Sequence, residues 1–77
     1  MPELRMFFKP TCPFCLKVID YIGVNGISVD LSDINDNDNA SELVKIGGKR
    51  QVPCLLIDGK PLYESDNIID WFKNNKA

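Results

Sequence analysis

The sequence contains no histidine, only three cysteines and a single tryptophan among its 77 residues. Histidine is the commonest general base and the commonest metal ligand in proteins. A zinc site with four ligands would have to use Cys12, Cys15 and Cys54 together with a carboxylate. We therefore expect neither histidine-dependent catalysis nor a structural zinc ion, and we assign no metal ligands.

Long apolar runs are also missing. The start "MPELRMFFKP" is interrupted by proline and charge, and no later segment approaches the length of a membrane span. The net charge is −2 and the bases form no stripe of the kind that binds nucleic acid. These absences predict a cytoplasmic protein without signal peptide, membrane segment or nucleic-acid partner. We expect residues 1–77 to form a single domain and to act as a monomer.

The hydrophobic pattern predicts seven elements. Apolar and β-branched runs indicate strands at 4–8, 27–31, 52–58 and 61–63, and apolar spacings of three and four indicate helices at 13–21, 39–46 and 64–77. The order is βαβαββα. A strand–helix–strand unit joins parallel strands, whereas the short "DG" turn joins antiparallel ones. The predicted fold class is α/β, with a four-stranded mixed sheet flanked by three helices.

Three local signals place helix ends. Asn39 with Glu42 is a variant of the capping box, Gly47 and Gly48 form a helix stop, and Ser65 is the expected N-cap of the last helix. The acidic loop before Asn39 has alternating Asp and Asn like a calcium loop. It lacks the glycine and the final glutamate that such a loop requires, so we interpret it as a solvated loop.

The motif "CPFC" lies where the first strand gives way to the first helix. Cys12 is predicted at the N-cap and Pro13 at the first helical position. Unpaired N–H groups and the helix dipole stabilise a thiolate there, and Lys9 is the nearest cation. Cys15 follows about one turn later and further inside the helix. We therefore expect Cys12 to be the nucleophile and Cys15 the resolving thiol.

A disulfide between Cys12 and Cys15 would close a loop too short to stabilise the fold much, so we do not expect these thiols to form a structural disulfide. In a reducing compartment this spacing is typical of catalysis or metal binding. Cys54 lies alone in an apolar strand and is expected to be a small buried side chain.

The motif "KPTCPFC" together with "QVPCLLIDGKPLYESDNI" resembles the glutaredoxin family along nearly the whole chain. The resemblance implies a thioredoxin-like fold and a dithiol enzyme that exchanges thiols and disulfides with glutathione as cosubstrate, without a tightly bound cofactor. The implied partners are disulfide-containing and glutathionylated proteins. The implied process is electron transport in cell redox homeostasis.

The same resemblance implies a glutathione site. Lys9 and Phe14 would flank the tripeptide, and Lys49 and Arg50 would attract its glycine carboxylate. A cis Pro53 would face Cys12, and the Val52 backbone would pair with the cysteinyl unit. The γ-glutamyl end would bind at the start of the last helix. The implied glutathione-binding residues are Lys9, Phe14, Gln51, Val52, Pro53, Glu64, Ser65 and Asp66.

The chain departs from the family pattern at two places. Phe14 replaces the usual tyrosine, and Glu64 with Ser65 is closer to the Glu-Ser pair of glutathione transferase N-terminal domains. Three alternatives stay open from the sequence. They are a small redoxin reduced directly by thioredoxin reductase, a glutathione-transferase-like module, and a carrier or scaffold for an iron–sulfur cluster.

Overall fold

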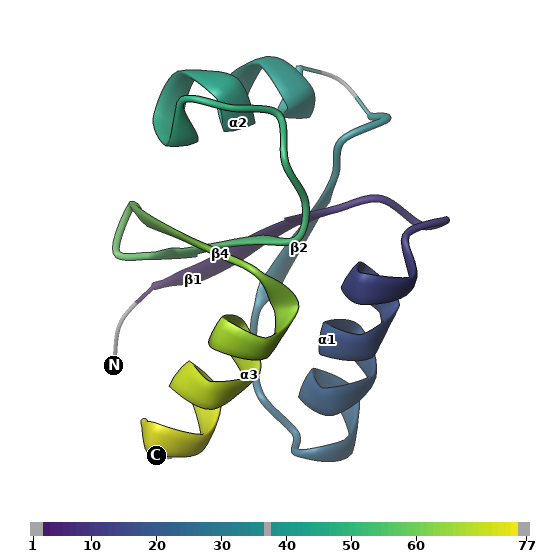
Figure 1. Cartoon of the computed structure of the whole chain (residues 1–77), viewed down its shortest axis with the longest axis vertical. Coiled ribbons are helices and arrows are strands. Elements are labelled where there is room, and N and C mark those ends of the chain that lie inside the picture. The colour runs from purple at the N-terminus through teal and green to yellow at the C-terminus, as the bar shows by residue number, and fades with distance from the viewer. Residues whose placement is uncertain (1–2, 37, 76–77) are drawn as a thin grey trace.

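The computed structural model describes residues 3–36 and 38–75, and its elements follow the predicted order (Figure 1). No helix within these residues is long and apolar enough to cross a membrane. The elements are β1 Leu4–Phe8, α1 Pro13–Val24, β2 Asp30–Asp33, α2 Asn39–Gly47, β3 Cys54–Ile57, β4 Lys60–Tyr63 and α3 Ser65–Asn74.

The four strands form one mixed sheet in the order β2-β1-β3-β4. β1 is parallel to β2 and antiparallel to β3, and β3 is antiparallel to β4. This confirms the predicted mixed sheet. The parallel pair arises because α1 carries the chain back along the sheet, and the antiparallel pair arises from the Asp58–Gly59 turn. Both turn residues have positive φ, 51° and 84°, as the favoured two-residue hairpin requires.

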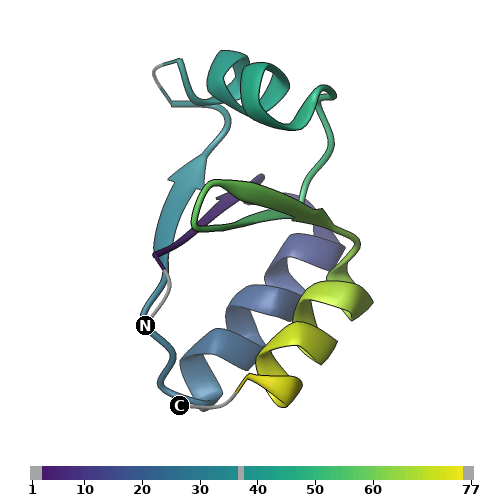
Figure 2. The same ribbon diagram turned by 90° about the vertical axis from the view of Figure 1, so that its left-hand side faces the viewer.

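Successive residues of β1 supply the two faces of the sheet. Met6 faces α1 and α3, whereas Phe7 faces α2, and both are fully buried. Figures 1 and 2 show α2 on one side of the sheet and α1 with α3 on the other. The larger core cluster, on the side of α1 and α3, consists of Met6, Val18, Ile22, Leu55, Ile68, Ile69 and Phe72.

The predicted bounds of the second strand were wrong. β2 covers Asp30–Asp33 instead of 27–31. Ile27 and Val29 do pack against the core, but they do so from the irregular segment that precedes the strand. The alternation of apolar residues therefore indicated which side chains are buried. It did not indicate which residues pair with β1, since that pairing begins where Asp30 lies opposite Arg5.

The predicted capping box of α2 is also wrong. Asp38 is the N-cap, and no side chain caps the helix. The Asn39 side chain donates to the Asp33 carbonyl oxygen at 2.8 Å and accepts a hydrogen bond from Arg5. Arg5 also pairs with Glu42, 2.7 Å from Nη1 to Oε2, so both expected capping residues are used to fasten α2 to the sheet. The predicted stop holds, since Gly48 ends α2 with a φ of 81°.

The remaining differences lie at element ends. α1 runs three residues beyond the predicted end, to Val24. β3 begins at Cys54 instead of residue 52, and the bond between Val52 and Pro53 is cis, as the family resemblance implied. β4 gains Lys60, and α3 ends at Asn74, while residues 76 and 77 of the predicted helix lie outside the described residues. Glu64 is the N-cap of α3, which corrects the assignment of that role to Ser65.

Candidate active site

Three segments that are far apart in the sequence meet at one end of the sheet. Phe7 pairs with Cys54, and Cys54 pairs with Tyr63. The loop that follows β1, the segment that precedes β3 and the start of α3 therefore leave the sheet from neighbouring positions. These segments carry Lys9, Cys12, Phe14, Cys15, Gln51, Val52, Pro53, Glu64, Ser65 and Asp66, which are all the predicted site residues.

Cys12 is the N-cap of α1, as predicted, and Pro13 is the first helical residue. A tight turn leads into it, because the Cys12 amide donates to the Lys9 carbonyl oxygen at 3.0 Å. The thiol makes no side-chain capping hydrogen bond. Its side chain is half-buried.

The pKa of the Cys12 thiol is lower than its ordinary value. Burial raises it, but the backbone N–H groups of Cys15 and Phe14, the Cys15 side chain and the charge of Lys9 lower it by more. This is the environment in which a thiol becomes a nucleophilic thiolate without a histidine base.

Cys15 has the opposite environment. It is fully buried under the first turn of α1, and burial raises the pKa of its thiol to about 12. A backbone hydrogen bond at Lys9 opposes this rise, whereas the hydrogen bond to Cys12 and the charge on Cys12 add to it. Cys15 is thus a protonated donor beside Cys12, and the two thiols differ as the prediction of nucleophile and resolving thiol requires.

Apolar surface is exposed next to the nucleophile. Phe14 is 63% exposed and Leu16 is 49% exposed, both on the first turns of α1. Lys9 is also exposed in the preceding loop. Large apolar side chains at this level of exposure are candidates for contact with a ligand or a partner.

The segment before β3 is fastened to the start of α3 by one hydrogen bond. Gln51 Nε2 donates to Glu64 Oε1 at 3.0 Å. Glu64 has a φ of 72° and a ψ of 124°, which is a strained backbone conformation for a residue with a side chain. The structure therefore brings together two of the predicted ligand-binding segments, and strain is concentrated where they join.

Ser65 and Asp66 form the first turn of α3, where free N–H groups and the positive end of the helix dipole favour an anion. Ser65 is buried, whereas Asp66 is exposed and pairs with Lys17 of α1. The hydrogen bond from Lys17 and its charge lower the pKa of the Asp66 carboxyl. The sequence analysis missed Lys17. Its spacing of three from Phe14 places both on one side of α1, which is the signal that could have found it.

Cys54 belongs to the other face of the sheet. It is fully buried in the cluster beneath α2, as expected for a packed thiol, and burial raises its pKa. Tyr63 shares a hydrogen bond with it and has the Lys49 ammonium 4.4 Å from its ring centre. Lys49 and Arg50 are exposed on the loop between α2 and β3.

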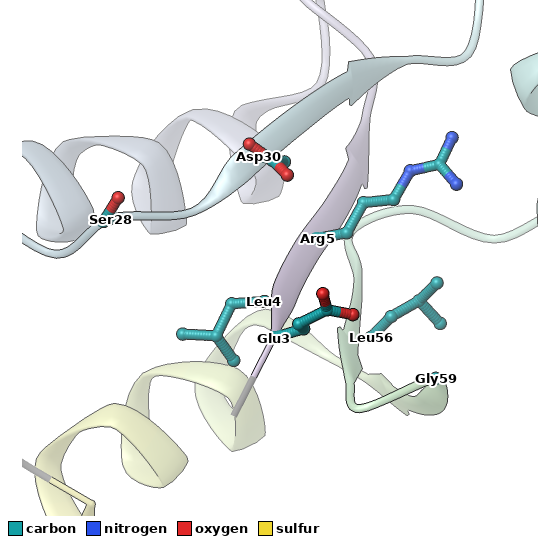
Figure 3. A pocket seen from close by; sticks show the side chains of 7 residues that line it. All are labelled: Glu3, Leu4, Arg5, Ser28, Asp30, Leu56 and Gly59. Carbon is teal, nitrogen blue, oxygen red and sulfur yellow. The ribbon is translucent and has the colours of Figure 1, made fainter. Parts of the chain in front are cut away.

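A hollow of about 390 Å³ lies at the opposite end of β1 from Cys12 (Figure 3). No cysteine lines this hollow. It therefore does not extend the site around Cys12. Its lining residues are Glu3, Leu4, Arg5, Ser28, Asp30, Leu56 and Gly59.

Comparison with known proteins places this arrangement in a family. The model of the glutathione S-transferase N-terminal domain matches residues 6–77. A glutaredoxin-like 8.6 kDa protein from the rubredoxin operon of Clostridium pasteurianum is 32% identical over 75 residues, which are 96% of this chain and 88% of that protein. Glutaredoxin 3 of Escherichia coli is 26% identical over 69 residues, covering 88% of this chain and 83% of that protein.

A longer relative is the hybrid peroxiredoxin hyPrx5 of Haemophilus influenzae, 27% identical over 70 residues. The match covers 91% of this chain, which spans 29% of that protein.

Solved structures agree with the sequence comparison. Glutaredoxin 2 of Salmonella typhimurium, in complex with glutathione, superposes with a TM-score of 0.80 at 28% identity, over 96% of this chain and 34% of that one. A wheat glutaredoxin gives 0.73 at 27% identity, over 96% and 73%. Further glutaredoxin and thioredoxin-like structures share the fold, which confirms the predicted thioredoxin-like architecture.

Cys12 and Cys15 lie close together at the start of α1, as the thiols of a Cys-x-x-Cys site do. This pair and the relatives together support a thiol–disulfide redox function. The chain belongs to the family of glutathione S-transferase N-terminal domains, within which it is a glutaredoxin-like protein.

Proposed function

We propose that the protein is a glutathione-dependent thiol–disulfide oxidoreductase that reduces protein disulfides and glutathione mixed disulfides. The observation that carries the proposal is the opposite perturbation of two adjacent thiols, with the pKa of Cys12 lowered and that of Cys15 raised to about 12. A nucleophile whose pKa is lowered and a neighbour that keeps its proton are what an ordered two-thiol reaction needs.

In the first step the Cys12 thiolate attacks one sulfur of the substrate disulfide. A bond forms between Cys12 and that sulfur, the substrate S–S bond breaks, and the other sulfur leaves as a thiolate that takes a proton from water. With a glutathione mixed disulfide as substrate, the product is a mixed disulfide between Cys12 and glutathione. With a protein disulfide, the substrate protein stays attached to Cys12 through one of its own sulfurs.

The second step depends on Cys15 or on free glutathione. Burial is the main reason for the raised pKa of Cys15, and the charge and hydrogen bond of the reduced Cys12 contribute as well. Both contributions from Cys12 vanish once Cys12 is in a mixed disulfide, so the pKa of Cys15 falls when its attack is needed. Cys15 then expels a bound protein thiol and forms the Cys12–Cys15 disulfide, or glutathione attacks the mixed disulfide and leaves Cys12 reduced.

Two further glutathione molecules reduce the Cys12–Cys15 disulfide and leave as glutathione disulfide. The proposed setting is the cytoplasm, where a flavoenzyme using NADPH keeps glutathione reduced.

The proposed glutathione site uses the three segments that meet at this end of the sheet. The Val52 backbone would pair with the cysteinyl unit in a strand-like manner, next to Pro53. Ser65 and Asp66 would hold the γ-glutamyl end at the start of α3. Gln51 and Glu64 would shape the space between these segments, and their hydrogen bond supports that role.

The outer side of the proposed site is basic and apolar. Lys9 and Phe14 would flank the tripeptide, and Lys49 and Arg50 would attract its glycine carboxylate from the exposed loop. The Salmonella protein of the same fold was solved in complex with glutathione, which supports glutathione as the ligand.

The test is turnover of a small glutathione mixed disulfide with glutathione as the only electron source, recycled by glutathione reductase and NADPH. We expect steady NADPH consumption that depends on the protein. No turnover under these conditions, with turnover restored by thioredoxin reductase, would reject glutathione dependence. It would favour a small redoxin that is reduced directly by thioredoxin reductase. A visible absorbance band in the protein purified without air would favour a cluster carrier instead.

A further inference from the structure

An ion pair joins the two helices that border the proposed glutathione site. Lys17 Nζ of α1 lies 2.5 Å from Asp66 Oδ1 of α3, and both side chains face solvent, with exposed fractions of 54% and 79%. Lys17 comes two residues after Cys15, and Asp66 is the second residue of α3. In the free protein the acid that would receive the ligand's ammonium group therefore already has a cation beside it.

The opening of this pair by a ligand depends on which charges the ligand carries. A ligand with an ammonium group alone would replace Lys17 at Asp66 and leave Lys17 without an anion, so it exchanges one ion pair for one. A ligand with an ammonium and a carboxylate on the same carbon would give its ammonium to Asp66 and its carboxylate to Lys17. That ligand exchanges one ion pair for two, and its carboxylate also lies at the start of α3.

We propose that Lys17 is a specificity-determining residue, which makes recognition of the γ-glutamyl end depend on the ligand's carboxylate and ammonium together. This inference rests on the proposed use of glutathione. In the absence of Lys17, the ammonium group would bind an unoccupied Asp66 without an exchange, and a ligand lacking the carboxylate would be rejected less strongly.

The exposure of the pair sets the size of the effect. Ion pairs between exposed side chains contribute little, because water and salt screen them. A pair of this kind opens readily, and it changes the preference for the ligand with a carboxylate over the ligand without one by about two- to fivefold. The effect should shrink at high salt, because the screening length falls to about 3 Å at 1 M.

The experiment compares three peptides as mixed disulfides with 2-mercaptoethanol. They are glutathione, its analogue with an α-carboxamide on the γ-glutamyl residue, and N-acetylglutathione. The second-order rate constant for transfer of each peptide to Cys12, with release of 2-mercaptoethanol, is followed by mass spectrometry. The variants are Lys17→Met and, as a matched control, Lys60→Met, which removes an exposed lysine from the distant hairpin.

We expect Lys17→Met to reduce the preference for glutathione over the carboxamide by about two- to fivefold, and to change the preference over N-acetylglutathione much less. Lys60→Met should keep both parental preferences, and 1 M NaCl should move the parent toward the Lys17→Met value. An unchanged or increased preference over the carboxamide in Lys17→Met would overturn the inference. A parent protein that does not distinguish glutathione from either analogue would reject the proposed glutathione site itself, and the inference with it.

Discussion

Cys12 and Cys15 perturb each other's ionisation, so that the pKa of Cys12 is lowered while that of Cys15 is raised to about 12. The difference follows from three residues of sequence. Cys12 caps α1 and is half-buried, whereas Cys15 lies one turn inside and is fully buried. One helix end thus lowers the pKa of one thiol and leaves its neighbour protonated.

Removal of each thiol should have a different effect. Cys12→Ser should abolish reduction of all disulfide substrates, because Cys15 and Cys54 are both fully buried. Cys15→Ser should keep the reduction of small glutathione mixed disulfides and lose that of intramolecular protein disulfides, since only the latter need the second thiol. The measurement is initial rates on both substrate types. Equal loss of activity on small mixed disulfides in both variants would contradict the assigned roles.

Loss of the Asp66 carboxylate should weaken substrate binding. Asp66→Ala should raise the KM for glutathione about three- to tenfold with little change in kcat, because a charge-assisted hydrogen bond to the ligand's ammonium is lost. The matched control is Asp70→Ala, which removes an exposed acid from the same helix further from its start. A KM in Asp66→Ala equal to that of the control would remove Asp66 from the site.

The backbone strain at Glu64 should lower the free energy of unfolding. Glycine adopts positive φ without steric cost, so Glu64→Gly should raise the free energy of unfolding by about 1 kcal/mol relative to Glu64→Ala. Both variants lose the hydrogen bond from Gln51, so the difference between their free energies of unfolding measures the backbone strain alone. Urea denaturation of the two variants provides the measurement, and equal midpoints would argue against strain at this residue.

Two helical glycines should respond in opposite ways to alanine. A Cβ at Gly23 of α1 would meet open space, so Gly23→Ala should stabilise the fold by about 0.5–1 kcal/mol. A Cβ at Gly47 of α2 would overlap the Tyr63 hydroxyl, so Gly47→Ala should destabilise it. Thermal unfolding of both variants tests this. Tyr63→Phe should reduce the cost of Gly47→Ala, and stabilisation by Gly47→Ala in the parent would refute the predicted overlap.

Much of the fold could be predicted because its signals are local. The Asp58–Gly59 turn, the Gly48 stop and the Cys12–Pro13 helix start each follow from the conformations that one or two residues prefer. The second strand could not be placed from local pattern. Ile27 and Val29 alternate like a strand because they are buried, but the ladder begins where Arg5 on another strand meets Asp30.

The same distinction between local signals and contacts of distant residues applies to the candidate site. The positions of Cys12 and Cys15 along one helix could be predicted, and the structure places both thiols there, while their roles stay a prediction. The spacing of Lys17 from Phe14 could place it on the same side of α1, but its pairing with Asp66 could not be predicted, because Asp66 is 49 residues away and approaches only when α1 and α3 pack together. The capping roles of Asn39 and Glu42 failed for a related reason, since Arg5 of β1 binds both.

The account depends most directly on ionisation of the Cys12 thiol. The decisive measurement is the rate of alkylation of Cys12 by iodoacetamide as a function of pH, with mass spectrometry to assign the modified residue. We predict that the rate rises with a midpoint clearly below about 8.5, the pKa of an ordinary cysteine, and that Cys15 stays unmodified over this range. A midpoint at or above about 8.5 for Cys12 would contradict the account.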